Sequence, residues 1–251
     1  MIIAQADRIL AFVRFQLTMH SIRRHLFLRR NPSRNGIEQL PERTQMSAKA
    51  IVCRVTMIPG GDAASRKAEL FESIQGSLRE MELQDLNAIE ISLVHSCYDP
   101  QMFTALVQFK SGLPEFLKRL KADPLYTHQF KMGDDDIGFD LSFHGLTQLY
   151  NPLVDCSEIT ADVVAITGLD GHAYGSWSGG NPKRMWLRDF LSKDLPKCRV
   201  MIYGYNSKLS NPGLHTIADF GRGLREELLR ARRSDQVASK FTAVSLGSND
   251  F

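Results

Sequence analysis

The chain has 251 residues, which fits one or two domains, and its 43% hydrophobic and 24% charged content is typical of a globular protein. Its net charge of +3 is unevenly distributed: residues 1–45 contain eight Arg and three acidic residues, a net of +5, so the other residues sum to −2. The charge of residues 46–251 therefore gives no support for nucleic-acid binding.

The four cysteines stand far apart, without a CxxC pair or a histidine at metal-ligand spacing. We therefore expect no metal site, no cofactor and reduced thiols at Cys53, Cys97, Cys156 and Cys198. No apolar run reaches the roughly 18 residues that a transmembrane helix needs. The start of the chain also lacks a compact apolar run with a small-residue cleavage site. An intracellular, cytoplasmic location is expected, and peripheral membrane contact stays open.

Residues 1–45 form a basic leader that we expect to be either disordered or a targeting segment. The leader is rich in Arg and poor in acidic residues, with short apolar runs at 9–13 and 26–28. This composition is typical of a mitochondrial presequence, which makes the mitochondrion the alternative location. The other interpretations are a disordered basic tail and upstream residues added by an over-long gene model, since Met46 opens the first well-patterned segment.

Residues 46–150 predict an α+β domain. β-rich and alternating apolar runs indicate strands, and apolar residues at helical spacing behind the N-cap Asp62 indicate the first helix. In chain order the expected elements are strand 51–58, helix 63–82, strand 89–93, strand 103–109, a short helix between Pro114 and Asp123, an acidic loop at 134–136 and strand 137–143. The order βαββαβ is that of the ferredoxin-like fold.

The same topology occurs in RNA-recognition motifs, whose sheet presents aromatic rings that stack on bases. Aligned on Phe109, this chain has Thr104 and Leu106 where rings are expected, and Cys53 at the corresponding place on the first strand. Each absent ring removes stacking of roughly 1–3 kcal/mol per base. We therefore expect no nucleic-acid partner, and favour a protein-docking or structural role for this domain.

Residues 151–251 predict the beginning of a parallel α/β sheet. In chain order the expected elements are strand 161–166, helix 186–191, strand 199–205 and helix 217–229. Both strands are apolar at consecutive positions, which indicates burial on both faces. The first strand is followed by a loop with Gly168, Gly171 and Gly175, where glycine allows backbone N–H groups to face outward. Alternating strands and helices are typical of a parallel sheet.

The runs VVAITGLDGHAYGSW and MWLRDFLSKDLPKCRVMIYGYNSKL resemble the serine esterase, lipase-like α/β-hydrolase domains of the serine active-site-containing protein group. These domains are common in filamentous fungi, where they often precede NB-ARC or NACHT modules. The preceding FHGLTQLYNP is similar as well. The resemblance covers about 140–233 strongly and 50–140 loosely. It implies an α/β-hydrolase fold, carboxylic-ester hydrolysis in full-length relatives, and endoplasmic-reticulum membrane association as a further alternative location.

The resemblance also implies roles for the glycine-rich loop. Gly168, Leu169 and Gly171 would form the oxyanion loop, with the backbone N–H of Leu169 as one donor. His172 and Trp177 would shape this loop and its packing. Thr167 stands where many relatives have a histidine. The donor is a backbone group, so this departure leaves it intact.

The nucleophile elbow GxSxG that the family would place next is absent from this sequence. The nearest match is Ala243-Val244-Ser245-Leu246-Gly247, which makes Ser245 the candidate nucleophile of a degenerate elbow; a chance match is the alternative. The last histidine, His215, precedes Ser245. A serine hydroxyl without a base is a weak nucleophile. The sequence therefore predicts a truncated, catalytically incompetent member of the family.

A rival interpretation is a non-catalytic protein-interaction or regulatory module. An incomplete parallel sheet would expose an edge and apolar surface. We therefore expect protein partners or self-association to cover it. Three segments are expected in all: the leader 1–45, the ferredoxin-like domain 46–150, and the first part of an α/β-hydrolase domain at 151–251.

Overall fold

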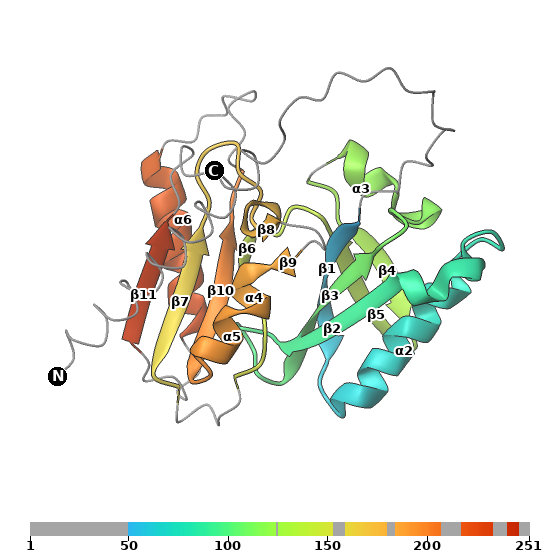
Figure 1. Ribbon diagram of the computed structural model, residues 1–251, viewed down its shortest axis with the longest axis horizontal. Coiled ribbons are helices and arrows are strands. Elements are labelled where there is room, and N and C mark those ends of the chain that lie inside the picture. Colours follow the sequence, from blue (N-terminus) through green and yellow to red (C-terminus); the bar gives the residue numbers. More distant parts are fainter. Residues whose placement is uncertain are drawn as a thin grey trace, which may run out of the picture. The chain divides into compact units, whose positions relative to one another are not determined.

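Two larger β-sheets and one short hairpin are formed by the described residues (Figure 1). The computed structural model describes residues 50–123, 125–152, 159–179, 184–206, 217–232 and 240–245, all within one unit of residues 48–246. The leader 1–45, His215 and the residues after Ser245 lie outside the described residues, as do the side chains of 240–245. Within the described ranges, every helix is too short or too polar to span a bilayer.

The first sheet has five strands in the order β2-β3-β1-β5-β4, and all neighbours run antiparallel. Its strands are β1 (Ile51–Pro59), β2 (Ile89–His95), β3 (Met102–Phe109), β4 (His128–Met132) and β5 (Asp135–Asp140). The apolar runs expected at 51–58, 89–93 and 103–109 fall within β1, β2 and β3.

Helices cover one face of this sheet. They are α2 (Ala63–Gly76) and α3 (Arg119–Ala122), with 3₁₀ turns at Leu83–Ala88 and Glu115–Leu117. Asp62 caps α2 by accepting a hydrogen bond from the Ser65 backbone N–H at 2.8 Å. Leu70 and Ile74 of α2 and Leu120 of α3 pack into one core with alternate residues of the strands. The helix expected to reach residue 82 ends at Gly76, and the chain continues in turns.

The prediction of an acidic loop at 134–136 is wrong for two of its three residues. Asp135 and Asp136 begin β5, which pairs with β4 through a tight turn in which Gly133 has φ +59°. Lys131 lies 3.0 Å from Asp136 across this hairpin, so opposite charges offset the acidic run. The same strand ends at Asp140 instead of 143, because Phe143 adopts φ +54°, which a strand cannot include.

The face of the first sheet opposite the helices is also buried where the RNA alternative would need it open. Thr104 is 8% exposed and Leu106 is 1% exposed. Arg54 pairs with Leu106, and because side chains alternate along a strand, Arg54 shares this face while Cys53 lies in the helix-side core. The alignment that placed Cys53 beside Thr104 and Leu106 is therefore wrong.

The second sheet has the order β11-β7-β10-β6. Its strands are β6 (Gly145–Gln148), β7 (Ala161–Ile166), β10 (Cys198–Gly204) and β11 (Lys240–Ser245). The strands β11, β7 and β10 run parallel, and β6 runs antiparallel to β10. β7 and β10 are buried along almost their whole length, as their continuous apolar runs predict. Residues 145–148 of the expected first domain therefore form β6 and pair in the second sheet.

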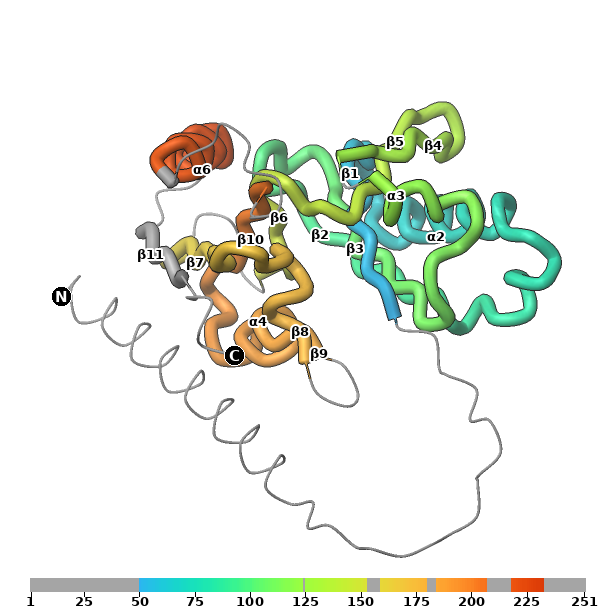
Figure 2. The backbone as a smooth tube through the Cα atoms, turned by 90° about the horizontal axis from the view of Figure 1, so that it is seen from above, coloured from blue at the N-terminus to red at the C-terminus, as the bar shows by residue number. Residues whose placement is uncertain are grey.

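Helices lie on opposite faces of the second sheet: α6 (Ile217–Ala231) on one and α4 (Trp186–Asp189) on the other (Figure 2). Leu224 and Leu228 of α6 pack against Val164 and Met201 of the sheet. The helix expected at 186–191 is interrupted, since α4 is followed by a separate turn, α5 (Leu191–Asp194).

The apolar side chains of this segment are only partly buried. Leu187 and Leu191 are buried, whereas Phe190 is 45% exposed with the Arg184 guanidinium 5.7 Å from its ring centre. A short hairpin of β8 (Ser178–Gly179) and β9 (Arg184–Met185) precedes α4.

A buried ion cluster joins the second sheet to α6 at the start of the parallel strands. The Asp162 carboxylate is fully buried in β7. Arg199 of β10 donates to both of its oxygens, at 2.8 and 2.9 Å, and Arg232 behind α6 lies 3.3 Å from one of them. Such pairing is what keeps a carboxylate charged in an apolar interior.

Candidate functional site

The loop after β7, residues 167–177, begins with a tight turn and is called the glycine loop below. The carbonyl of Gly168 accepts a hydrogen bond from the Gly171 N–H at 3.1 Å, and Asp170 takes φ +58° inside the turn. A Cβ at Gly171 would lie 2.8 Å from the Thr167 Cβ and 2.9 Å from the Gly168 carbonyl oxygen. The turn therefore requires glycine at 171 for steric reasons.

This turn sets the direction of the Leu169 N–H. In a planar trans peptide, the carbonyl of one residue and the N–H of the next point in opposite directions. The Gly168 carbonyl points into the turn toward Gly171, so the Leu169 N–H points out of it. In the part of the chain that the structure describes, this N–H has no hydrogen-bond partner. The turn therefore presents an outward backbone N–H at Leu169, the residue to which the resemblance assigns a donor role.

The base of the loop is tied to β10. The Tyr205 hydroxyl, one residue beyond β10, donates to the Thr167 carbonyl at 2.8 Å. Tyr205 is itself held by ring contacts with Tyr203 and Phe220. This role of Tyr205 is not predicted from the sequence. The signal that could have suggested it is an aromatic residue at the end of a buried strand.

The His172 side chain holds the glycine loop in place through hydrogen bonds from both of its ring nitrogens. Its Nδ1 lies 3.2 Å from the Tyr174 N–H and 2.9 Å from the Gly175 N–H, and its Nε2 lies 2.8 Å from the Leu141 carbonyl oxygen. Because Nδ1 faces two N–H donors, it must carry the lone pair that accepts them. Because Nε2 faces a carbonyl oxygen, it must carry the hydrogen that it donates. His172 is therefore neutral with its proton on Nε2. Its ring holds the loop and does not have a lone pair free for proton transfer.

Phe143 packs the glycine loop against the segment 141–144, which joins β5 to β6 and is called the β5–β6 turn below. Its ring stacks on Tyr174 at 5.3 Å and meets His172 edge-on at 5.8 Å. Phe143 is fully buried with φ +54°, a conformation that costs a non-glycine residue of order 1–3 kcal/mol. Surrounding contacts must hold it in place.

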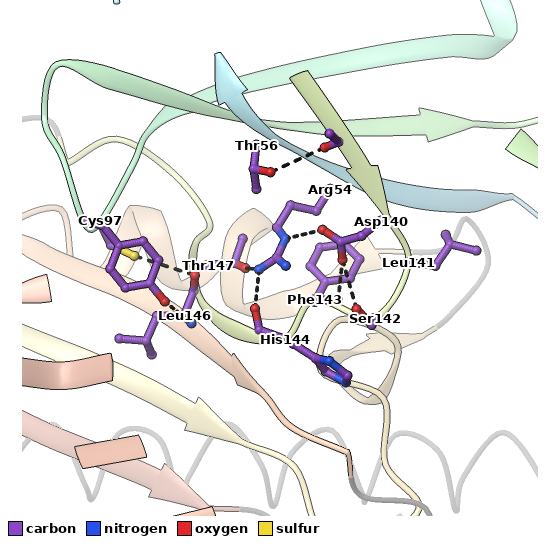
Figure 3. Close-up of polar contacts among 12 residues, drawn as sticks. Arg54, Thr56, Cys97, Asp140, Leu141, Ser142, Phe143, His144, Leu146 and Thr147 are labelled. Carbon is purple, nitrogen blue, oxygen red and sulfur yellow. Dashed lines mark hydrogen bonds and ion pairs between the residues drawn. The ribbon is translucent and has the colours of Figure 1, made fainter. Parts of the chain in front are cut away.

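Those contacts come from an ion cluster centred on Arg54 of β1 (Figure 3). Its Nε donates to Asp140 at 2.8 Å, and its Nη1 donates to the His144 carbonyl at 2.8 Å and the Thr147 hydroxyl at 2.9 Å. The second Asp140 oxygen accepts the Phe143 N–H at 2.7 Å. Arg54 and Asp140 side chains are 11% and 6% exposed, so water screens their attraction weakly.

Ser245 lies at the same edge of the second sheet as the glycine loop. In the parallel pairing of β11 with β7, Ser245 stands opposite Ile166, the last residue before the loop. Carboxyl ends of parallel strands meet at one edge, so the backbone of Ser245 lies at the sheet edge from which the glycine loop begins. Leu246 and Gly247 of the candidate elbow lie outside the described residues.

Within the described ranges, no group of three or more His, Cys, Asp or Glu side chains is placed to hold a metal ion. Cys53, Cys97 and Cys198 are buried free thiols, and burial raises the pKa of Cys97 to about 12. These thiols are therefore protonated and unsuited to nucleophilic chemistry at neutral pH.

Two histidines predict a pH dependence of stability. Burial lowers the pKa of His144. The charge of Arg54 lowers it by a smaller amount, and the charge of Asp140 opposes this by raising it. Burial alone lowers the pKa of His128. The unfolded chain, with ordinary values near about 6.5, then binds more protons at mildly acidic pH. Stability is complete above about pH 6.5 and falls as the pH drops toward the folded values. Thermal unfolding between pH 7.5 and 5.5 should show a falling midpoint, and a His128→Gln/His144→Gln variant a flatter profile; an unchanged profile would contradict this.

No protein-family model, curated protein or solved structure matches the chain. A functional assignment therefore depends on the geometry at this edge of the sheet and on the resemblance in the sequence.

Proposed function

We propose that residues 145–245 are the nucleophile-bearing part of a lipase-like serine esterase fold, whose full-length relatives hydrolyse carboxylic esters. The observation that supports the proposal is the parallel pairing of β11 with β7, in which Ser245 pairs with Ile166, the residue before the glycine loop. In α/β-hydrolases, the nucleophilic serine follows a sheet strand, and one oxyanion donor comes from the loop after another strand. Ser245 and the Leu169 N–H would fill these two roles.

The electrostatics of the turn support the role of Leu169. An oxyanion donor must be fixed in direction before the charge develops, because reorientation during the reaction costs free energy. Here the Gly168–Gly171 hydrogen bond and the steric need for Gly171 fix the peptide that carries the Leu169 N–H. The second donor in this fold is the N–H of the residue after the nucleophile, which would be Leu246.

The proton acceptor is the part of the triad that these 251 residues lack. The triad of the fold follows the chain order Ser, Asp or Glu, His. All seven histidines precede Ser245, and His172, which lies in the glycine loop, has its Nδ1 lone pair occupied by two N–H donors. A general base contributes roughly 10²–10⁴-fold in rate. We therefore expect a polypeptide of these residues alone to be catalytically incompetent.

A fluorophosphonate probe tests the proposal. Without added base we expect no ester turnover and no labelling. Added imidazole, as an external proton acceptor, should produce slow labelling at Ser245, located by peptide mass spectrometry and abolished in Ser245→Ala. Ser248, in the same peptide, is the internal control and should stay unlabelled. Equal labelling of Ser245 and Ser248 would overturn the assignment of Ser245, and ester turnover that survives Ser245→Ala would show that another group performs the chemistry.

The rival proposal is a non-catalytic interaction module, and the observation that favours it is the outer edge of β11. In the described residues, no strand pairs with that edge, so its backbone groups are available to a protein partner or a second copy of the chain. Absence of labelling with and without imidazole would favour this role over the hydrolase proposal. We also propose a reducing, intracellular location, for which the support is the three buried free thiols.

A further inference from the structure

A continuous series of contacts runs from the first sheet to the glycine loop. It begins at Arg54 in β1 and passes through Asp140 at the end of β5 to the N–H of Phe143. From the β5–β6 turn, the Leu141 carbonyl receives the Nε2 proton of His172, and the Phe143 ring packs on His172 and Tyr174. Every link is a direct hydrogen bond, ion pair or ring contact.

We propose that Arg54 is a positioning residue for the glycine loop, acting through the β5–β6 turn. The inference rests on the proposed function, because it makes the first sheet part of the structure that holds the oxyanion donor in place. Arg54 touches no residue of the glycine loop in the contacts described, so its effect is indirect. Figure 3 shows the Arg54 guanidinium between Asp140, which precedes the turn, His144, which ends it, and Thr147, which follows it.

The charge of Arg54 is needed because the turn is strained and its acidic residue is buried. Asp140 holds Phe143 in its positive-φ conformation by accepting the Phe143 N–H, and a buried carboxylate remains charged only when it is paired. Loss of the guanidinium would leave Asp140 without its ion-pair partner. It would also free the His144 carbonyl and the Thr147 hydroxyl, so the turn could relax toward ordinary backbone angles.

Relaxation of the turn would reach the glycine loop through two contacts. The Leu141 carbonyl fixes the His172 ring, and that ring in turn accepts the Tyr174 and Gly175 N–H groups. The Phe143 ring lies against both His172 and Tyr174. A shift of the turn therefore changes the support of the loop at His172 and Tyr174, while the Tyr205 contact to Thr167 remains.

The test is amide hydrogen exchange in Arg54→Met, a change that retains the apolar stem and removes the charged fork. The hydrogen-bonded amides in this segment, those of residues 171, 172 and 174–176, should exchange at least about tenfold faster than in the wild type, since hydrogen bonds to charged groups can change a local opening equilibrium by that factor. Amides of β3 and of the middle of β10 should stay near their wild-type rates. Arg54→Lys should give an intermediate effect, because an ammonium cannot reproduce the fork of three contacts.

Arg66→Met is the matched control. Arg66 lies beside the same sheet and pairs with Glu69 at 2.9 Å and Asp135 at 3.5 Å, away from the β5–β6 turn. Its removal should leave exchange at 168–176 unchanged. Wild-type exchange in that segment of Arg54→Met, or equal acceleration throughout the protein, would overturn the inference.

If Arg54→Met fails to fold, a milder variant, Thr147→Val, tests the same inference by removing one hydrogen-bond acceptor of Arg54. It should accelerate exchange at 168–176 to a smaller extent, again without a change in β3. The NMR signals of the His172 ring add a second readout. When the hydrogen bond to the Leu141 carbonyl is broken, the ring should no longer be held in the Nε2–H tautomer and should show a mixture of both tautomers. Neither readout requires Ser245 to react, so failure of the proposed hydrolase function and failure of this inference are distinguishable.

Discussion

Replacement of Asp162 by asparagine should lower the free energy of unfolding by about 3–5 kcal/mol, because Asp162 is the one acidic side chain among the described residues that forms an ion pair with the buried Arg199. Arg199 is 6% exposed and donates two hydrogen bonds to Asp162, and the neutral amide can accept in one of these places only. Arg232 would lose its contact with the same carboxylate. Denaturant or thermal unfolding measures the change, which corresponds to a midpoint lower by roughly 10 °C.

Asp136→Asn is the control for this prediction. Asp136 forms an ion pair with Lys131 at 3.0 Å, but both side chains are about two thirds exposed, and exposed pairs contribute less than about 1 kcal/mol. The two variants therefore change the same chemical group in opposite environments. Equal unfolding energies for Asp162→Asn and Asp136→Asn would show that the buried cluster does not stabilise the second sheet.

Gly204→Ala should be the second strongly destabilising change, with a loss of about 3 kcal/mol or more through overpacking. A Cβ at Gly204 would lie 2.0 Å from the Phe143 carbonyl oxygen and 2.6 Å from its carbon. Both are backbone atoms, so no side chain can rotate to make room. Either β10 or the β5–β6 turn must move, and unfolding experiments together with amide exchange at 141–146 would locate the displacement.

Gly221→Ala provides the matched comparison within α6. Nothing lies within 4 Å of the added Cβ, and the residue is helical, so alanine should stabilise by about 0.5–1 kcal/mol. If Gly204→Ala were as well tolerated as Gly221→Ala, the close contact between β10 and the β5–β6 turn would be refuted.

Much of the arrangement of strands could be predicted from the sequence because apolar periodicity reports burial. β7 and β10 were expected from runs of consecutive apolar residues, and α6 from apolar residues at helical spacing. Apart from β11, the strands that escaped prediction (β4, β6, β8 and β9) are short or polar. β6 contains Thr147 and Gln148, which are buried despite their polarity because they pair within the sheet and contact Arg54 or the backbone.

The candidate site was predictable only where it depends on local backbone chemistry. Gly168 and Gly171 were found because glycine marks turns, and Ser245 because of its likeness to an elbow. The support of the loop was not predictable. Arg54, Phe143 and Tyr205 act across separations that no spacing rule connects, and a buried phenylalanine with φ +54° contradicts the local preference of its residue type.

The position of β6 has a consequence for how this protein can be divided. The chain leaves the first sheet at Asp140 and enters the second at Gly145, and Arg54 binds groups on both sides of that passage. A recombination breakpoint at 141–144 would hand Thr147 and Gly204 to one descendant and Arg54 to the other. Neither half would retain a complete ion cluster. We therefore expect the two sheets to be inherited together as one unit and not to be exchanged separately between proteins.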